Sequence, residues 1–154
     1  MSTNIVNLSK FEPGKLPLEV FNGIAHLTVT PVMELLVISE QTVLLSRRAN
    51  TDQYWPNQYS IPGSIIYSGG PKSLDEYAGK ILARLDINTN ANPRLKGIEL
   101  CSTRRGDEIA IVYRIDIDSI PNLDNHLSFV ELKDLSELDI ISEHREILQK
   151  YLIG

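Results

Sequence analysis

The chain has 154 residues, of which 42% are apolar and 23% charged, and its formal net charge is −5. This length predicts one domain, and the composition is that of an ordinary globular protein with enough apolar residues for a core. The acidic balance offers no basic field for nonspecific nucleic-acid binding. The sequence also has no run of 18 apolar residues, so no membrane span is expected.

The polar start of the sequence, MSTNIVNLSK, lacks the apolar region of a signal peptide. The single cysteine, Cys101, rules out an intramolecular disulfide, which fits a reducing compartment. Because Cys101 lies in the apolar run GIELCS, we expect a buried structural thiol. Together these features predict a cytoplasmic protein.

The first 20 residues contain Pro13-Gly14 and Pro17 and predict an irregular lead-in, with the domain over residues 21–154. Clusters of apolar and β-branched residues then predict short strands. These strands are expected at residues 24–30, 33–38 and 43–46 and, interrupted by Pro62-Gly63, at residues 59–66. The polar and aromatic loop of residues 49–59 is long for a small domain, and such loops are often functional.

A helix after Ser73 is the clearest element of the sequence. Ser73 and Glu76 have the spacing of a capping box, in which the Ser73 hydroxyl accepts from the Glu76 amide and Glu76 reaches back to the Ser73 amide. From Leu74 to Leu85 the apolar residues recur at helical spacing and predict one continuous stripe that faces the core. Asp86 and the asparagines that follow it end the helix.

The second half of the chain predicts two strands, a further strand with a helical turn, and a last helix. The first two strands cover residues 94–102 and 108–116, and the turn 104–107 between them is expected to be solvated. The later elements are expected at residues 127–140 and 142–152. Alternation in the second strand places every other residue on one face; these residues are Ile109, Ile111, Tyr113 and Ile115.

One series of residues follows the order of a known family: Val43-Leu44-Leu45, Arg47-Arg48, Trp55, Pro62-Gly63 and, before the last helix, the phrase FVELKDL. With the helix after Ser73, it resembles the central strand–loop–helix of the Nudix superfamily. The resemblance covers roughly residues 24–153 and implies an α/β fold, a Nudix-type α/β/α sandwich with a mixed curved sheet.

The superfamily's box, G-x5-E-x7-R-E-U-x-E-E-x-G-U with U a bulky apolar residue, holds divalent metal ions against a diphosphate through its helix glutamates. Aligned without a gap, Ser64 stands for the box glycine and the two glutamates fall on Leu82 and Ala83. With one extra residue in the loop 68–71, they fall on Ala83 and Arg84.

We favour the gapped register, because the apolar box positions then fall on Ile81 and Ile87. In that register the R-E pair of the box falls on Gly79 and Lys80. Neither register places a carboxylate at a metal-ligand position, and magnesium prefers oxygen ligands. We therefore expect no metal ion at this helix.

The resemblance and the residue types together suggest six ligand-binding residues: Arg47, Arg48, Trp55, Ser64, Lys80 and Arg84. Lys80 and Arg84 are four apart, so they share one helix side and can replace metal ions as fixed cations against a diphosphate. The alternative is a solvated face on which Glu76 pairs with Lys80. Many superfamily members have a phosphate-binding arginine near Arg47-Arg48, and the alternative for at least one of the two is a surface role. Trp55 either stacks on a base or anchors the loop.

No catalytic residue stands out. The three histidines lack the spacing of a zinc site. Several carboxylates are conceivable general bases, and the sequence does not distinguish among them: Glu34, Glu40, Asp107 and Glu131.

Three functions remain open. The first is a domain that binds a nucleoside-diphosphate-type small molecule with weak or no hydrolysis. The second is a variant Nudix hydrolase that cleaves a nucleotide-sugar-like diphosphate with Mg²⁺; the phrase RRAN resembles the R-x-N of the superfamily's GDP-mannose-type branch. The third is a non-catalytic structural or interaction domain, for which a homodimer is possible.

Overall fold

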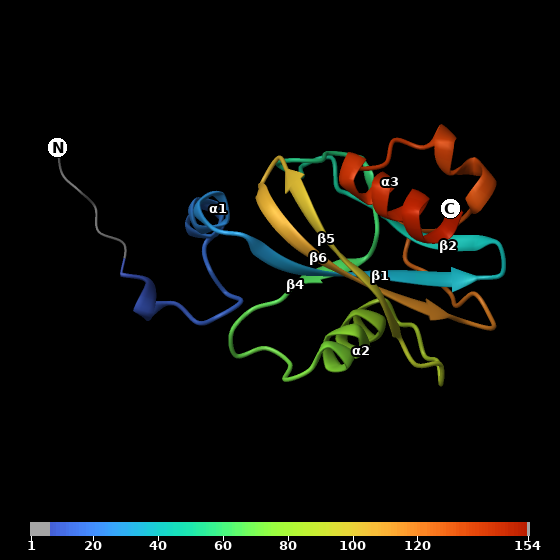
Figure 1. Ribbon diagram of the computed structural model, residues 1–154, viewed down its shortest axis with the longest axis horizontal. Coiled ribbons are helices and arrows are strands. Elements are labelled where there is room, and N and C mark those ends of the chain that lie inside the picture. Colours follow the sequence, from blue (N-terminus) through green and yellow to red (C-terminus); the bar gives the residue numbers. More distant parts are fainter. Residues whose placement is uncertain (1–6, 154) are drawn as a thin grey trace.

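A mixed sheet lies between two helices in the computed structural model, which describes residues 7–153 (Figure 1). Helix α2 (Leu74–Arg84) covers one face, and helix α3 (Ser142–Leu148) covers the other. The α/β/α sandwich predicted from the sequence is therefore confirmed.

The sheet has seven strands in the order β3-β2-β1-β6-β5, with β4 also paired to β1 and β7 to β2. Among the strand pairs of residues 7–153, β1 and β6 run parallel and the other pairs are antiparallel. The strands are β1 (Thr30–Ser39), β2 (Thr42–Arg47), β3 (Tyr59–Ser60), β4 (Gly63–Ile65), β5 (Arg94–Thr103), β6 (Gly106–Asp116) and β7 (Leu127–Glu131).

The central strand β1 supplies both cores, because successive side chains of a strand point to opposite faces. Met33 and Leu35 pack in the α2 core, whereas Val32 and Leu36 pack in the α3 core. The alternation also places Glu34 on the α3 face. This position decides the geometry of the candidate site.

Helix α2 buries the predicted apolar stripe, including Ile81 and Leu82. Its start differs slightly from the prediction. The Ser73 Oγ accepts from the Glu76 N–H at 3.2 Å, as expected, but Glu76 Oε2 accepts from the Lys72 N–H at 2.9 Å instead of from Ser73. The Glu76 side chain is thereby held at the end of the helix.

The prediction of a strand over residues 24–30 is wrong, because most of this stretch belongs to helix α1 (Leu18–Leu27). The helix begins directly after Pro17, a residue that suits a helix start. Leu18, Phe21 and Ile24 recur at helical spacing, but the β-branched residues that lead into β1 made the stretch look extended. The predicted lead-in also contains a short 3₁₀ turn, η1 (Leu8–Lys10).

After β7 the chain forms the 3₁₀ helix η2 (Leu132–Glu137), then α3, and ends in the π-helical turn η3 (Gln149–Ile153). These elements match the predicted strand, short helical turn and C-terminal helix. No helix in the described part of the chain is both long and apolar enough to cross a membrane.

Candidate functional site

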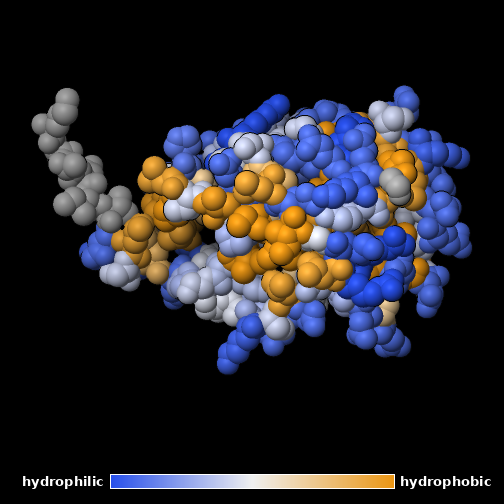
Figure 2. All heavy atoms as spheres, in the orientation of Figure 1, coloured by the Kyte–Doolittle hydropathy of each residue, from blue (hydrophilic) through white to orange (hydrophobic). Residues whose placement is uncertain are grey.

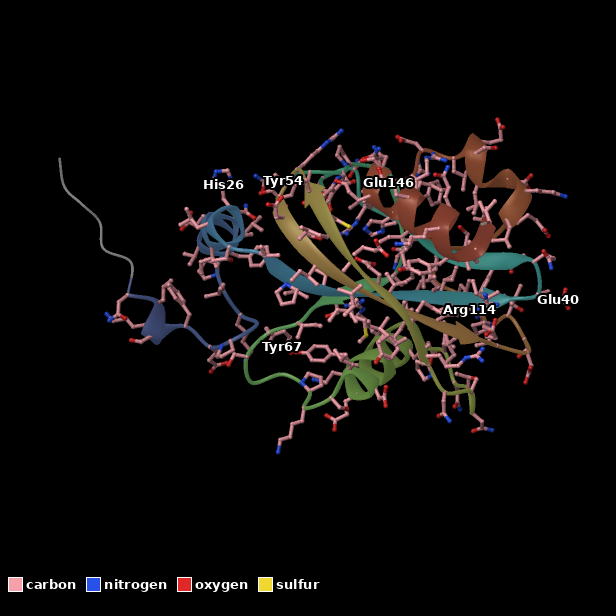
Figure 3. The ribbon with its side chains drawn as sticks, viewed as in Figure 1. His26, Glu40, Tyr54, Tyr67, Arg114 and Glu146 are labelled. Carbon is pink, nitrogen blue, oxygen red and sulfur yellow. The ribbon has the colours of Figure 1, made fainter. Side chains whose placement is uncertain are left out.

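A cleft of about 670 Å³ lies among α1, the start of β1, β4 and the loop that leads to α2. One wall is apolar and is formed by Leu18, Phe21, Ile24, Ile65 and Tyr67. The ring of Tyr67 lies on the loop between β4 and α2 (Figure 3). This volume is in the range of sites that bind small molecules.

Five polar side chains from five different segments also line the cleft: Glu34, Arg48, Ser64, Arg84 and Arg105. They come from β1, the end of β2, β4, α2 and the β5–β6 turn, respectively. The cleft thus combines an apolar wall with three guanidinium groups and one carboxyl group. An apolar pocket with a few convergent polar groups is typical of a small-molecule site.

Glu34 is buried, and its burial, followed by the negative charge of Glu108, raises the pKa of its carboxyl group to about 8. Its Oε2 has no hydrogen-bond partner within residues 7–153. Gly63 allows this placement, because a Cβ at position 63 would lie 2.6 Å from Glu34 Oε2. With this pKa, the group is mostly protonated at neutral pH and can both donate and accept a hydrogen bond.

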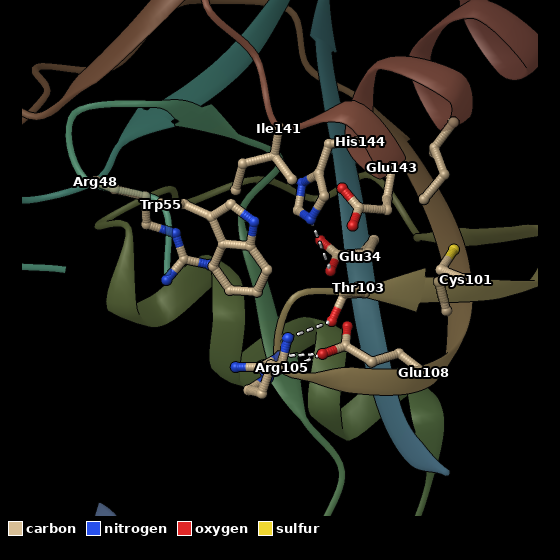
Figure 4. A pocket seen from close by; sticks show the side chains of 12 residues that line it. Glu34, Arg48, Trp55, Cys101, Thr103, Arg105, Glu108, Ile141, Glu143 and His144 are labelled. Atoms are coloured by element: carbon tan, nitrogen blue, oxygen red, sulfur yellow. Dashed lines mark hydrogen bonds and ion pairs between the residues drawn. The ribbon is translucent and has the colours of Figure 1, made fainter. Parts of the chain in front are cut away.

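His144 lies behind Glu34, with its Nε2 3.7 Å from Glu34 Oε1 (Figure 4). Its Nδ1 accepts from the Ile61 N–H at 2.8 Å, so the ring proton is on Nε2. Burial and the charges of Arg48 and Arg105 lower the pKa of His144 to about 3. These residues border a small cavity of about 30 Å³, which is roughly the size of one water molecule.

Arg105 corrects the prediction of a solvated β5–β6 turn. Its side chain is only 17% exposed, and its Nε donates to Glu108 Oε1 at 2.9 Å. The guanidinium also lies 5.6 Å from the ring of Phe21 and 5.5 Å from that of Trp55. Arg105 therefore attaches α1 and the loop 49–58 to the sheet, and its charge is already compensated. The sequence contains no indication of this role, because it depends on where α1 lies relative to the β5–β6 turn.

Lys80 and Arg84 line a second cavity of about 240 Å³, which shares Ser64, Tyr67 and Arg84 with the cleft. Arg84 Nη2 donates to the Gly63 carbonyl oxygen at 2.6 Å. Neither cation forms a salt bridge within residues 7–153. The Glu76–Lys80 pair expected for a solvated helix face is absent from this part of the chain.

The other sequence-predicted ligand residues separate into two groups. Arg48 turns inward, 5.6 Å from the Trp55 ring and 3.6 Å from Asp52, and its buried Nε has no partner in the described residues. Trp55 is 5% exposed, anchors the loop and borders only the small cavity. Arg47 is exposed, donates to the Asn57 carbonyl oxygen at 3.3 Å and borders neither the cleft nor the two cavities.

Of the conceivable general bases, only Glu34 lies in the cleft. Glu40 is in the β1–β2 turn, at the opposite end of the sheet from α1 (Figure 3). Asp107 and Glu131 are exposed. The sequence signal for Glu34 was its position as the one charged residue in the apolar run VMELLVI.

Sequence reasoning missed His144, Arg105 and Glu108 as partners of Glu34, because they come from distant segments.

Cys101 also borders the small cavity beside Glu34 and His144. The thiol is half-buried and not fully buried as predicted. Burial and the charge of Glu108 raise the pKa of the Cys101 thiol to about 11, so little of the reactive thiolate forms at neutral pH.

The residues on α2 do not fit the metal site that the sequence resemblance implies. The aligned glutamate positions hold Ala83 and Arg84, and Lys80 lies one turn earlier. No group of three His, Cys, Asp or Glu side chains within residues 7–153 is arranged to hold a metal ion.

No protein-family model matches this chain, and no curated protein matches it. Solved structures do. The NUDIX domain of Shewanella oneidensis NrtR, complexed with ADP ribose, superposes with a TM-score of 0.67 at 14% identity, covering 80% of this chain and 86% of that chain. A mutT/nudix family protein from Listeria innocua superposes with a TM-score of 0.65 at 14% identity, covering 80% of this chain and 92% of that chain. The MutT protein from Methanosarcina mazei Go1 superposes with a TM-score of 0.62 at 18% identity, covering the same shares of the two chains, 80% and 92%. The chain therefore has the Nudix fold.

Proposed function

We propose that this protein binds a nucleoside-diphosphate-type small molecule in the cleft without using a metal ion. The observation that carries the proposal is the pair Lys80 and Arg84, two cations without a carboxylate partner within residues 7–153. Arg84 lies where the cleft and the second cavity meet. The similar NrtR domain, which is complexed with ADP ribose, supports this class of ligand.

The diphosphate is assigned to the junction of the two cavities. Arg84 uses Nη2 for the Gly63 carbonyl, which fixes the guanidinium and leaves its other N–H groups for an anion. Lys80 adds a second positive charge one helical turn away, and the Ser64 hydroxyl lines both cavities. Fixed cations of this kind favour phosphate oxygens through charge-assisted hydrogen bonds.

The organic part of the ligand is assigned to the apolar wall formed with α1. Phe21 and Tyr67 offer ring faces for a base or a similar flat group. Arg48 Nε and Glu34 Oε2 are both buried without a partner in the described residues and line the same cleft. Buried polar atoms of this kind normally find partners, and we assign the polar groups of the ligand to this end of the cleft.

Calorimetric titration with ADP-ribose, ADP and inorganic diphosphate in the presence of EDTA tests this proposal. We expect binding in EDTA, and we expect Lys80→Ala to weaken it about 10- to 100-fold, the effect of losing one charge-assisted contact. Lys133→Ala is the matched control, because Lys133 lies on η2 and borders neither the cleft nor the cavities. Binding that requires Mg²⁺, or that is unchanged in Lys80→Ala, would contradict the proposal.

One observation favours a second candidate, a variant hydrolase that cleaves a nucleoside diphosphate linked to another group. Glu34 lies in the cleft with a pKa of about 8, and perturbed carboxyl groups in clefts are frequent general acids and bases. This activity would need metal ligands from outside α2. Release of phosphate-bearing products from nucleotide sugars with Mg²⁺, lost in Glu34→Gln and retained in Lys80→Ala, would favour the hydrolase over the binding protein.

A further inference from the structure

A broad apolar surface extends from the end of α1 across the outer strands of the sheet. Figure 2 shows it as an orange area at the centre of the visible face. Six side chains form it, and we call them the β5–β6 face: Leu27 (83% exposed), Leu100 (75%), Ile98 (62%), Leu95 (51%), Val29 (45%) and Ile109 (37%). Aliphatic residues exposed to this degree and gathered in one place mark interaction sites.

This face is bare because α2 covers only the middle of its side of the sheet. Tyr113 and Ile115 of β6 are buried against α2, but Ile109, nearer the start of the strand, is outside this cover. On the edge strand β5, Ile98 pairs with Ile111 and Leu100 pairs with Ile109, so these side chains form two adjacent rows on one face. No described helix covers these rows.

We propose that the β5–β6 face is a homodimer interface, in which a second copy of this chain covers the same face through a two-fold axis. The six side chains expose an apolar area of roughly 600 Å² per copy, so a dimer would bury roughly 1,200 Å² before its polar rim is counted, which reaches the size of a stable interface. A face made of paired strand rows can pack on its own copy, as two sheets do in a β-sandwich.

Charge at the two ends of the face favours a second copy over a different partner. None of the six side chains is charged, whereas Lys96 lies in the register shift between Leu95 and Gly97 at one end, and Asp107, two residues before Ile109, shares the face at the other. A two-fold axis between two antiparallel copies brings the Lys96 end of each copy against the Asp107 end of the other. Both ends are then matched by opposite charge, which sets the register of the dimer.

Sedimentation equilibrium of the full chain at about 10–200 μM tests this interface. We expect the wild-type protein to be a dimer and Ile98→Glu to be a monomer. Ile120→Glu, on a residue of similar exposure (54%) outside the face, is the matched control and is expected to remain dimeric.

A charge exchange provides a test that does not change the apolar residues. Lys96→Asp and Asp107→Lys should each weaken the dimer by about 4- to 25-fold, because each substitution removes two symmetry-related exposed ion pairs worth about 2- to 5-fold apiece, and the double variant should recover the wild-type affinity. A wild-type monomer at 200 μM would overturn the proposal. A dimer that persists in Ile98→Glu, or a double variant weaker than both single ones, would overturn it as well. If Ile98→Glu does not fold by circular dichroism, the charge exchange decides.

Discussion

The buried carboxyl group of Glu34 should make the protein less stable as the pH rises. Burial and Glu108 raise its pKa from an ordinary value of 4.5 to about 8, so folding binds a proton between these values. The stability is fully present below the unfolded pKa and is lost as the pH rises through the folded pKa. Glu34→Gln replaces the carboxyl by a neutral group of the same shape. The substitution should therefore raise the free energy of unfolding at neutral pH. It should also remove the part of the pH dependence of stability that Glu34 causes.

The magnitude follows from the two pKa values at about 1.4 kcal/mol per pH unit. At pH 7 the raised pKa of Glu34 lowers the free energy of unfolding by about 3 kcal/mol, and the wild-type protein should lose about 2 kcal/mol of stability between about pH 6.5 and pH 8.5. His144 has the opposite effect, because its pKa is lowered and its contribution is lost as the pH falls below 6.5. The window above pH 6.5 separates the two groups.

Urea unfolding followed by tryptophan fluorescence at several pH values in this window measures the difference between Glu34→Gln and the wild type. Glu131→Gln, a substitution of an exposed carboxylate at the end of β7, is the control and should follow the wild-type profile. If Glu34→Gln is less stable than the wild type at pH 7 and shows the same slope with pH, the reasoning on Glu34 is refuted. The charged form would then be compensated within the fold.

Three further predictions concern α2. Leu82→Ala removes a side chain that is 8% exposed in the α2 core and should lower the free energy of unfolding by about 2–5 kcal/mol in chemical denaturation; a silent substitution would mean that the stripe does not support the core. Ser73→Ala removes the hydrogen bond to the Glu76 amide and should cost about 0.5–2 kcal/mol in the same assay. Crystals soaked in Mn²⁺ should show no anomalous peak within coordination distance of residues 79–84, and a strong peak there would show that the alignment of the box is wrong.

The sequence predicted the elements whose pattern is local. The stripe and the Ser73 cap of α2, the alternation of β6 and the final helix all depend on residues a few positions apart, and the structure confirms them. Helix α1 was missed because its C-terminal half is followed by β-branched residues that continue into a strand, and Gly23 interrupts its pattern. Tertiary packing of Phe21 against Arg105 supports a helix that the local sequence signals only weakly.

The candidate site was harder to predict because it depends on contacts between distant segments. Arg48 and Arg84 were predicted to bind a ligand, and both line one cleft. Arg47 was predicted as well, but the geometry at the end of β2 turns its side chain to the Asn57 carbonyl, away from the cleft. Glu34 was one of four equal candidates until its burial beside His144 distinguished it. The pattern of one sequence contains no information about such a pair, which lies 110 residues apart.

The parallel pairing of β1 with β6 also determines how the chain can fold. Every pair in this ladder, from Thr30 with Glu108 to Ile38 with Asp116, joins positions about half the chain length apart. The β1–β2 and β5–β6 hairpins need only short loops, so they can form early, whereas the β1–β6 ladder must wait for a large loop to close at considerable entropic cost. Closure of this ladder joins the two hairpins into one sheet, and both cores depend on that sheet. We therefore expect substitutions at the contact of β1 and β6 to slow folding more than substitutions in α3 do, which stopped-flow refolding would measure.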